Sequence, residues 1–357
     1  MEKIINSNII NSKPKTTKIL KTILKTSKKQ DEINSLLIYC ITWNLHGKMP
    51  SKEELSKIIP LDKEYEIIII STQECVRSIL LSFLITNKEE WILMLKNYLG
   101  KKYVNLANEN LSAFHISLFV NKKIKNDFKN IITGKIKTGY LNIIANKGAV
   151  AIGVKYKKYD LLFINCHLSA GDHNFEKRNA DFERINNELT FEVYEYNKKN
   201  KDIIINNNFT VTDNFDIIIW CGDFNSRLYN ITYDNAFSSI KNKDYNYLFK
   251  YDQFNNDILN MKININGFQE GIIDFPPTYK YLENHNFYDY SQKLPGWTDR
   301  IIFKSKKFND LLLCKYDCIM NTTISDHKPV FAIFKLDFDN EKEDDSINNQ
   351  NQVCSVF

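Results

Sequence analysis

Short apolar runs that end in polar residues recur along the chain. The clearest covers residues 217–221, which are three isoleucines, a tryptophan and a cysteine. Its length and its β-branched residues are typical of a buried strand. Asp223 and Asn225 then stand two positions apart, so both side chains would leave the strand end on the same side. By itself this stretch also fits an ordinary turn, because Asp and Asn are common there.

The same pattern predicts most of the regular structure. Helices are predicted over residues 79–99, 175–191 and 233–262. Because strands outnumber helices, we expect two sheets packed face to face with helices on the outside. The other predicted strands cover residues 36–43, 65–71, 114–120, 131–137, 149–156, 161–166, 301–303, 311–316 and 330–336.

These elements predict one globular domain over residues 35–338, with a different composition on either side. In the segment 1–34, apolar residues at positions 19, 20, 23 and 24 have helical spacing among many lysines. Such a segment fits either a basic helix lying on an acidic membrane or a flexible, solvated tail. Residues 339–357 are acidic and then rich in Asn and Gln, which predicts a flexible tail.

Composition narrows the class of protein. The 357 residues are 43% hydrophobic, enough for a substantial core, and the net charge is +5. This mild charge suits an anionic substrate or a membrane face and does not require nucleic acid. The seven cysteines are scattered and form no zinc-binding pattern, so we expect reduced thiols in a cytosolic compartment. No apolar run reaches about 18 residues, so no membrane-spanning helix is expected.

Polar residues of catalytic type follow several of the predicted strands. Each has an ordinary explanation alone, such as a surface carboxylate or a structural histidine. Enzymes, however, gather functional groups on loops that a rigid sheet holds in place, so the whole set predicts an active site. The set is Asn44, Glu74, His167, Asp223, Asn225, Asp299, Asp326 and His327.

Over roughly residues 36–336 the chain resembles the inositol polyphosphate 5-phosphatases of the endonuclease/exonuclease/phosphatase superfamily. Three stretches carry this resemblance beyond the catalytic set: Asn-Lys-Gly-Ala-Val at 146–150, Phe-Pro-Pro-Thr-Tyr-Lys-Tyr at 275–281 and Pro-Gly-Trp-Thr-Asp-Arg-Ile at 295–301. The resemblance implies an α/β, DNase I-like fold, a four-layer sandwich of two packed, mostly antiparallel sheets with helices outside. Domain 35–338 would then be the catalytic domain.

The resemblance implies a Mg²⁺ site and a hydrolytic mechanism. Glu74 would bind the metal with Asn44 nearby, and Asp326 would reach it through water, since Mg²⁺ prefers oxygen ligands and keeps several waters. We expect Asp223 to take a proton from the attacking water and Asn225 to orient that water.

The two histidines would then act on the phosphate. Asp299 would fix the ring of His327 so that its other nitrogen faces the phosphate, and His167 would add a second donor.

Other matched positions are expected to hold substrate. The resemblance implies this role for Asn146, Lys147, Tyr279, Lys280, Lys293 and Arg300. For each lysine the alternative is a solvated surface charge. The family often has Gly-Arg-Met/Leu-Gly before Asn-Lys-Gly, whereas this chain has Asn-Ile-Ile-Ala at 142–145, so one basic contact is lost and the loop is more apolar.

The expected activity is Mg²⁺-dependent hydrolysis of the 5-phosphate of phosphoinositides, such as phosphatidylinositol 4,5-bisphosphate or 3,4,5-trisphosphate, of soluble inositol polyphosphates, or of both. The alternatives are a nuclease of the same superfamily and a catalytically inactive membrane or scaffold module. The Pro-Pro-Thr-Tyr-Lys stretch argues against the nuclease, and the retained catalytic set argues against the inactive module. No nucleic-acid partner is expected, and the chain identifies no protein partner.

The last four residues, Cys354-Ser355-Val356-Phe357, have the Cys-a-a-X form of a prenylation site, for which Phe favours geranylgeranyl. The chance alternative is a Cys at that position without modification. We therefore predict a cytoplasmic, peripheral membrane protein from which Cys354→Ser is released to the cytosol. One lipid chain binds a membrane only marginally, so we expect a second membrane contact from the Lys-rich segment 1–30 or from the apolar loop at Ile143-Ile144. Deleting residues 1–30 should then weaken attachment when Cys354 is present. Fractionation of cells measures both effects, and a Cys354→Ser protein that stays in the membrane pellet would contradict the anchor.

Overall fold

The computed structural model describes residues 35–75, 88–139, 145–193, 210–263, 265, 267–289, 293–307 and 309–338. The predicted basic segment 1–34, the loop 142–144 and the tail 339–357 with Cys354 lie outside these residues. Within the described residues, no helix is both long enough and apolar enough to cross a membrane.

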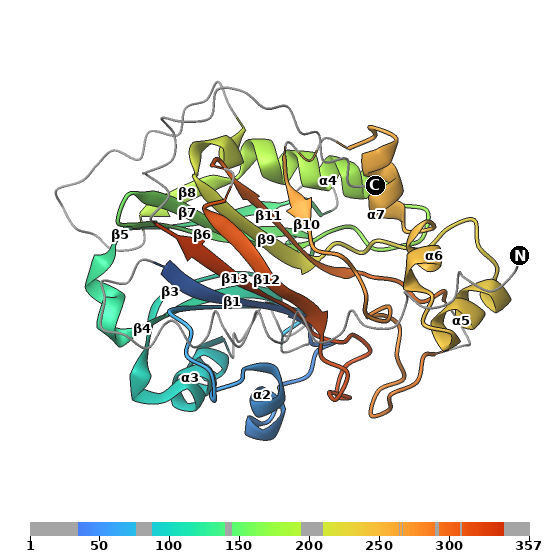
Figure 1. Ribbon diagram of the computed structural model, residues 1–357, viewed down its shortest axis with the longest axis horizontal. Helices are drawn as coiled ribbons and strands as arrows, with labels where there is room; N and C mark the ends of the chain where they lie inside the picture. Colours follow the sequence, from blue (N-terminus) through green and yellow to red (C-terminus); the bar gives the residue numbers. More distant parts are fainter. Residues whose placement is uncertain are drawn as a thin grey trace, which may run out of the picture.

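Two sheets form the centre of the molecule (Figure 1). In the six-stranded sheet only β1 and β2 run parallel, and in the seven-stranded sheet only β7 and β9 do. The first sheet has the order β12 (Leu311–Cys318), β13 (Val330–Asp337), β1 (Ser35–Asn44), β2 (Ile67–Gln73), β4 (Phe114–Asn121), β3 (Tyr103–Leu111). The second has the order β10 (Gln269–Glu270), β11 (Asp299–Ser305), β9 (Ile217–Asp223), β7 (Tyr159–His167), β6 (Gly148–Tyr156), β5 (Phe128–Lys137), β8 (Thr190–Val193).

Helices cover the outer faces of both sheets, which gives the expected four layers (Figure 1). Helix α4 (Phe175–Glu188) lies on the seven-stranded sheet, where Phe182 stacks on Trp220 with ring centroids 4.4 Å apart. Helices α2 (Lys52–Ile58) and α3 (Lys88–Leu99) lie on the six-stranded sheet. The central strands are thus buried on both faces, which explains why their sequences are continuously apolar rather than alternating.

The expected fold class is confirmed, and several element boundaries differ. Strand β3 and helix α2 were not predicted. The helix predicted over 175–191 ends at Glu188, because Thr190 begins an edge strand that pairs with β5. The helix predicted over 233–262 is three short helices, α5 (Tyr233–Lys241), α6 (Tyr245–Phe249) and α7 (Gln253–Leu259). Each begins at its own N-cap side chain, Thr232, Asp244 and Asp252, so capping divided the segment.

A buried polar network joins the two sheets across the apolar core. The Gln73 amide of β2 donates to Asn165 Oδ1 of β7 at 2.6 Å. The Asn165 amide donates back to the backbone oxygens of Thr72 and His115 at 3.0 and 2.8 Å. Polar groups in a core are costly unless they are paired, so this network favours one alignment of the sheets over any shifted one.

Replacing Asn165 should reveal how much this network contributes to stability. We predict that Asn165→Leu lowers the free energy of unfolding by about 2–4 kcal/mol, because three buried hydrogen bonds are lost and their partners stay in the core. Equilibrium unfolding in urea measures the change. The control Asn235→Leu, on the exposed side of α5, should change the value by less than about 0.5 kcal/mol. Equal effects of the two substitutions would contradict a stabilising role for the network.

Candidate active site

Strand register places the predicted catalytic residues in one row. His167 ends β7 opposite Asp223 at the end of β9, and Asp223 in turn pairs with Asp299 at the start of β11. Gly222 allows the close approach of β7 and β9, since its φ is +145° and a Cβ there would lie 2.1 Å from the Cys166 carbonyl oxygen. Asn44 joins the row from the other sheet and donates from Nδ2 to Asp223 Oδ2 at 2.9 Å.

Asp223 is a buried carboxylate surrounded by groups that stabilise its charge. The backbone N–H of Asn225 donates to its Oδ1 at 2.9 Å, and His167 Nε2 lies 3.4 Å from its Oδ2. Burial opposes ionisation, but the electrostatic effect of His167 where its ring is protonated, the positive charges of His327 and Lys147, and the Asn44 hydrogen bond lower the pKa of Asp223 below its ordinary value. Asp223 is therefore an acceptor at neutral pH.

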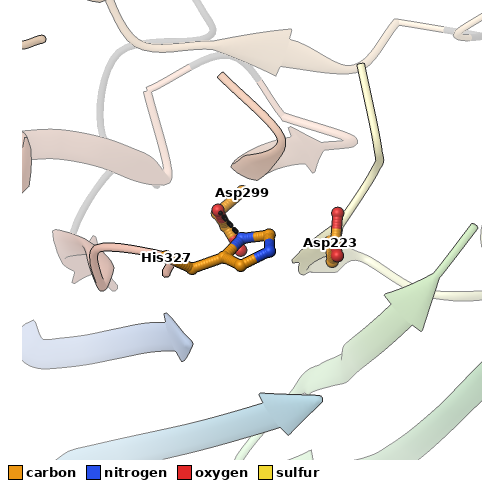
Figure 2. A group of neighbouring side chains, drawn as sticks. All are labelled: Asp223, Asp299 and His327. Carbon is orange, nitrogen blue, oxygen red and sulfur yellow. Dashed lines mark hydrogen bonds and ion pairs between the residues drawn. The ribbon is translucent and has the colours of Figure 1, made fainter. Parts of the chain in front are cut away.

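Asp299 and His327 form the pair that the sequence predicts. Asp299 Oδ2 lies 2.8 Å from His327 Nδ1 and also accepts hydrogen bonds from the hydroxyls of Thr278 and Thr298 at 2.9 and 2.8 Å. Figure 2 shows the second ring nitrogen of His327 facing Asp223. Burial alone would lower the pKa of His327, but the carboxylates around it, first of all Asp299, raise it to about 9.

His167 has the opposite protonation state. Burial and the adjacent Lys147 lower the pKa of His167 to about 4, so its ring is neutral at pH 7. Lys147 Nζ lies within hydrogen-bond contact of His167 Nε2, and burial lowers the pKa of Lys147 to about 8. In this arrangement His167 Nε2 accepts a hydrogen bond from the Lys147 ammonium group, so it is not free to act as the expected second donor.

The residues expected to hold a metal come from two strand ends and one loop, and Glu74 and Asp326 both lie near His46. Asn44 ends β1, Glu74 follows the parallel strand β2, and Asp326 lies in the loop before β13. Asp326 is 5% exposed, and its Oδ1 makes no hydrogen bond to any described residue. A buried carboxylate oxygen of this kind, beside other oxygen ligands, fits a divalent cation such as Mg²⁺.

A second arrangement of ligand atoms is less suitable for a metal. Asp223, Asp299 and His327 offer one ligand atom each, all within 4.8 Å of one another. However, a protonated imidazole cannot bind a cation, and the charge on His327 is stabilised by Asp299. The oxygen-rich side at Asn44, Glu74 and Asp326 therefore fits a metal better.

Of the predicted substrate residues, Lys147 and Tyr279 contact this row. The Tyr279 ring packs on the His327 ring with centroids 4.4 Å apart, and Lys280 Nζ lies 3.1 Å from Asp289 Oδ2. Asn146 is exposed beside Lys147, and Lys293 is half-buried just before Trp297. Their contacts with a substrate remain predictions.

Arg300 requires a correction. Its guanidinium is fully buried and forms ion pairs with Asp252 at 2.7 Å and Glu270 at 2.6 Å. In β11 successive side chains point to opposite faces, so Arg300 points away from the face on which Asp299 meets His327. Arg300 joins β11 to β10 and to the start of α7 through these pairs, and its fully buried guanidinium is not accessible to a substrate.

Two residues of the site were not assigned by the sequence. His46 Nδ1 lies 3.4 Å from Asp326 Oδ1 and 3.9 Å from Glu74 Oε2, among the expected metal ligands. Arg227 donates from Nη2 to Asn225 Oδ1 at 2.6 Å. Each stands two positions after a predicted site residue, Asn44 or Asn225, and this spacing was the available signal.

Comparisons with known proteins agree with this geometry. A family model described as endonuclease/exonuclease/phosphatase family 2 matches residues 41–333. The chain is 33% identical over 313 residues to a phosphatidylinositol 4,5-bisphosphate 5-phosphatase of Saccharomyces cerevisiae, covering 84% of this chain and 31% of that protein. It is 28% identical over 341 residues to synaptojanin of Caenorhabditis elegans, covering 88% of this chain and 29% of that protein. The chain thus spans about a third of the length of these relatives.

Solved structures confirm the fold. The inositol polyphosphate 5-phosphatase domain of SPsynaptojanin, in complex with inositol (1,4)-bisphosphate and a calcium ion, superimposes with a TM-score of 0.69 at 27% identity, covering 90% of this chain and 89% of that one. A Cimex nitrophorin, as a ferrous NO complex, superimposes with a TM-score of 0.65 at 20% identity, covering 85% and 99%. The second likeness concerns the fold alone, so function depends on the site residues.

The charge on His327 can be tested through its carboxylate partner. We predict that Asp299→Asn lowers the pKa of His327 from about 9 toward its ordinary value, because burial remains and the largest opposing charge is removed. The wild-type contribution to stability is present below pH 6.5 and is lost as the pH rises through about 9, and the variant should lack it. NMR titration of labelled histidines, assigned with His327→Gln, measures the pKa. Thr278→Val keeps the carboxylate and should shift the pKa less, so equal shifts would contradict the assignment.

Proposed function

Because the chain belongs to the inositol polyphosphate 5-phosphatase family of the endonuclease/exonuclease/phosphatase superfamily, we propose that it removes the 5-phosphate from an inositol ring. The substrate would be a phosphoinositide headgroup or a soluble inositol polyphosphate, which present the same ring phosphates. The observation that carries this proposal is the row formed by a deprotonated Asp223 and a protonated His327, whose second nitrogen faces that carboxylate.

In the proposed reaction Asp223 accepts a proton from the attacking water. Hydrogen bonds from Asn44 and from the Asn225 backbone hold the carboxylate in place. His327, fixed through Nδ1 by Asp299, donates from its other nitrogen to a phosphate oxygen. Lys147 supplies a further positive charge next to His167. Preset donors of this kind stabilise the charge of a phosphoryl-transfer transition state.

Asn44, Glu74 and Asp326 would hold a divalent metal, proposed to be Mg²⁺, which would neutralise phosphate charge and stabilise the leaving oxygen. A SPsynaptojanin domain structure contains a calcium ion together with inositol (1,4)-bisphosphate, which supports a divalent cation and this ring chemistry for a relative. Lys280 and Tyr279 are proposed to hold the phosphate next to the scissile one. We also propose that Cys354 attaches the protein to the cytosolic face of a membrane.

We predict that wild-type protein with Mg²⁺ releases phosphate from phosphatidylinositol 4,5-bisphosphate vesicles, from inositol 1,4,5-trisphosphate or from both, and that Asp223→Asn turns over about 10²–10⁴ times more slowly. The carboxamide has the size of the carboxylate and cannot accept the proton. Phosphate release and a melting curve are measured for each protein. Asp234→Asn, which changes an exposed carboxylate on α5, is the matched control and should keep wild-type activity.

The same panel distinguishes the alternatives. Inositol 4-phosphate and abasic duplex DNA should not react, and a chelator should abolish release. Cleavage of the DNA would instead support a nuclease. Absence of release from every 5-phosphorylated compound by folded wild-type protein would contradict the proposed activity, as would near-normal turnover by Asp223→Asn.

A further inference from the structure

Arg227 has a buried guanidinium that the described protein groups do not satisfy. Its residue is 6% exposed, and Nη2 donates a hydrogen bond to Asn225 Oδ1 at 2.6 Å. Nε and Nη1 are buried and make no hydrogen bond to any described residue. A guanidinium always carries its charge and offers five N–H donors, so this arrangement is costly unless another acceptor completes it.

The position of this side chain is fixed by its surroundings. The backbone oxygen of Arg227 accepts a hydrogen bond from Gln253 N at 2.9 Å. The guanidinium carbon lies 4.7 Å from the centre of the Tyr279 ring, which itself packs on His327. Asn225, on the other side, receives its position from Asp223 through the backbone hydrogen bond. Arg227 therefore lies within the site, next to the proposed catalytic groups.

The neighbouring carboxylate of Asp172 does not accept a hydrogen bond from the guanidinium of Arg227. Asp172 Oδ1 lies 3.8 Å from Arg227 Nε, beyond hydrogen-bond distance, and the Asp172 side chain is 54% exposed. Because the Asp172 carboxylate is half exposed and too far away for a hydrogen bond, its contact with Arg227 is weak, and a stronger anion would replace it easily. Arg178 of α4 differs in this respect, because it is also buried but donates to Gln253, Ser169 and Gly171.

We propose that Arg227 is a substrate-binding residue whose Nη1 donates to an oxygen of the phosphate that is removed. A phosphate monoester dianion supplies the charged acceptor that this buried donor lacks among the described residues, and the charge-assisted hydrogen bond would offset the cost of burying the guanidinium. The assignment to the scissile phosphate rests on the proposed function and on the direct bond from Arg227 to Asn225, next to Asp223. The ring phosphate beside it remains with Lys280.

The test uses inorganic phosphate, the reaction product, as a probe that needs no turnover. In Arg227→Gln the affinity for inorganic phosphate, measured by calorimetry and as a competitive inhibition constant, should fall about 10- to 100-fold, as for the loss of charged hydrogen bonds. Arg227→Lys keeps the positive charge but loses the planar guanidinium donors. Its affinity for inorganic phosphate should lie between those of the wild-type protein and Arg227→Gln. The kcat/KM values for inositol 4,5-bisphosphate and inositol 5-phosphate should fall by similar factors in Arg227→Gln. In Lys280→Ala only kcat/KM for inositol 4,5-bisphosphate should fall strongly.

Asp172→Asn is a control that changes the carboxylate near Arg227 and leaves Arg227 itself intact. Removing the competing carboxylate should leave the affinity for inorganic phosphate unchanged or raise it up to about fivefold. Melting curves are recorded for every variant, so that only folded proteins are compared.

Three results would overturn the inference. They are wild-type affinity for inorganic phosphate in folded Arg227→Gln, a loss confined to inositol 4,5-bisphosphate, and a fall in kcat with no change in phosphate affinity, which would make Arg227 a positioning residue for Asn225. If instead the wild-type protein hydrolyses neither compound, the proposed function fails. The phosphate affinities of the variants still decide whether Arg227 binds this anion.

Discussion

The alignment of the two sheets across the core is the constraint on which the site depends. Gln73 and Asn165 form a hydrogen bond between the sheets. At the ends of β1 and β9 the Asn44 amide forms a second one with the Asp223 carboxylate. A shift of one residue in either sheet would turn alternate side chains to the wrong face and separate both pairs. The apolar contacts of the core would tolerate such a shift better than hydrogen bonds would. The polar pairs therefore supply specificity where the hydrophobic contacts supply most of the stability.

Two histidines at similar depth have opposite charges because their neighbours differ. His327 faces Asp299, Asp326 and Asp223, and these carboxylates outweigh the cost of burial. His167 faces the ammonium of Lys147 and stays neutral. Asp223 lies between them and benefits from the positive groups on both sides. One buried cluster thus holds a proton acceptor and a proton donor at the same pH, as hydrolysis of a phosphate ester requires.

The sequence predicted the layers, and the meeting of polar strand-end residues in one row, more accurately than the details around them. Buried strands are continuously apolar, and the polar residues at their ends stand out, so Asp223, His167 and Asp299 were recognisable. Arg300 was misassigned because sequence shows neither the face on which a strand residue points nor the buried Asp252 and Glu270 that pair with it. Arg227 received no role because the absence of partners around a buried side chain is a three-dimensional property. Short capped helices such as α5, α6 and α7 look continuous in a pattern of apolar spacing.

The pairing of β1 with β13 joins the beginning and the end of the domain. Trp43 Nε1 donates to the His327 carbonyl oxygen at 3.0 Å, and the Ser325 hydroxyl donates to the Asn44 carbonyl oxygen at 2.7 Å. The two hydrogen bonds that hold this part of the site together therefore join residues 284 and 281 positions apart in the sequence. A nascent chain holds Asn44, Glu74, His167 and Asp223 long before His327 exists. During synthesis the chain therefore passes through a long interval in which most of the core residues are present but the proposed site lacks His327, so this site cannot assemble before the segment that leads into β13 has been made.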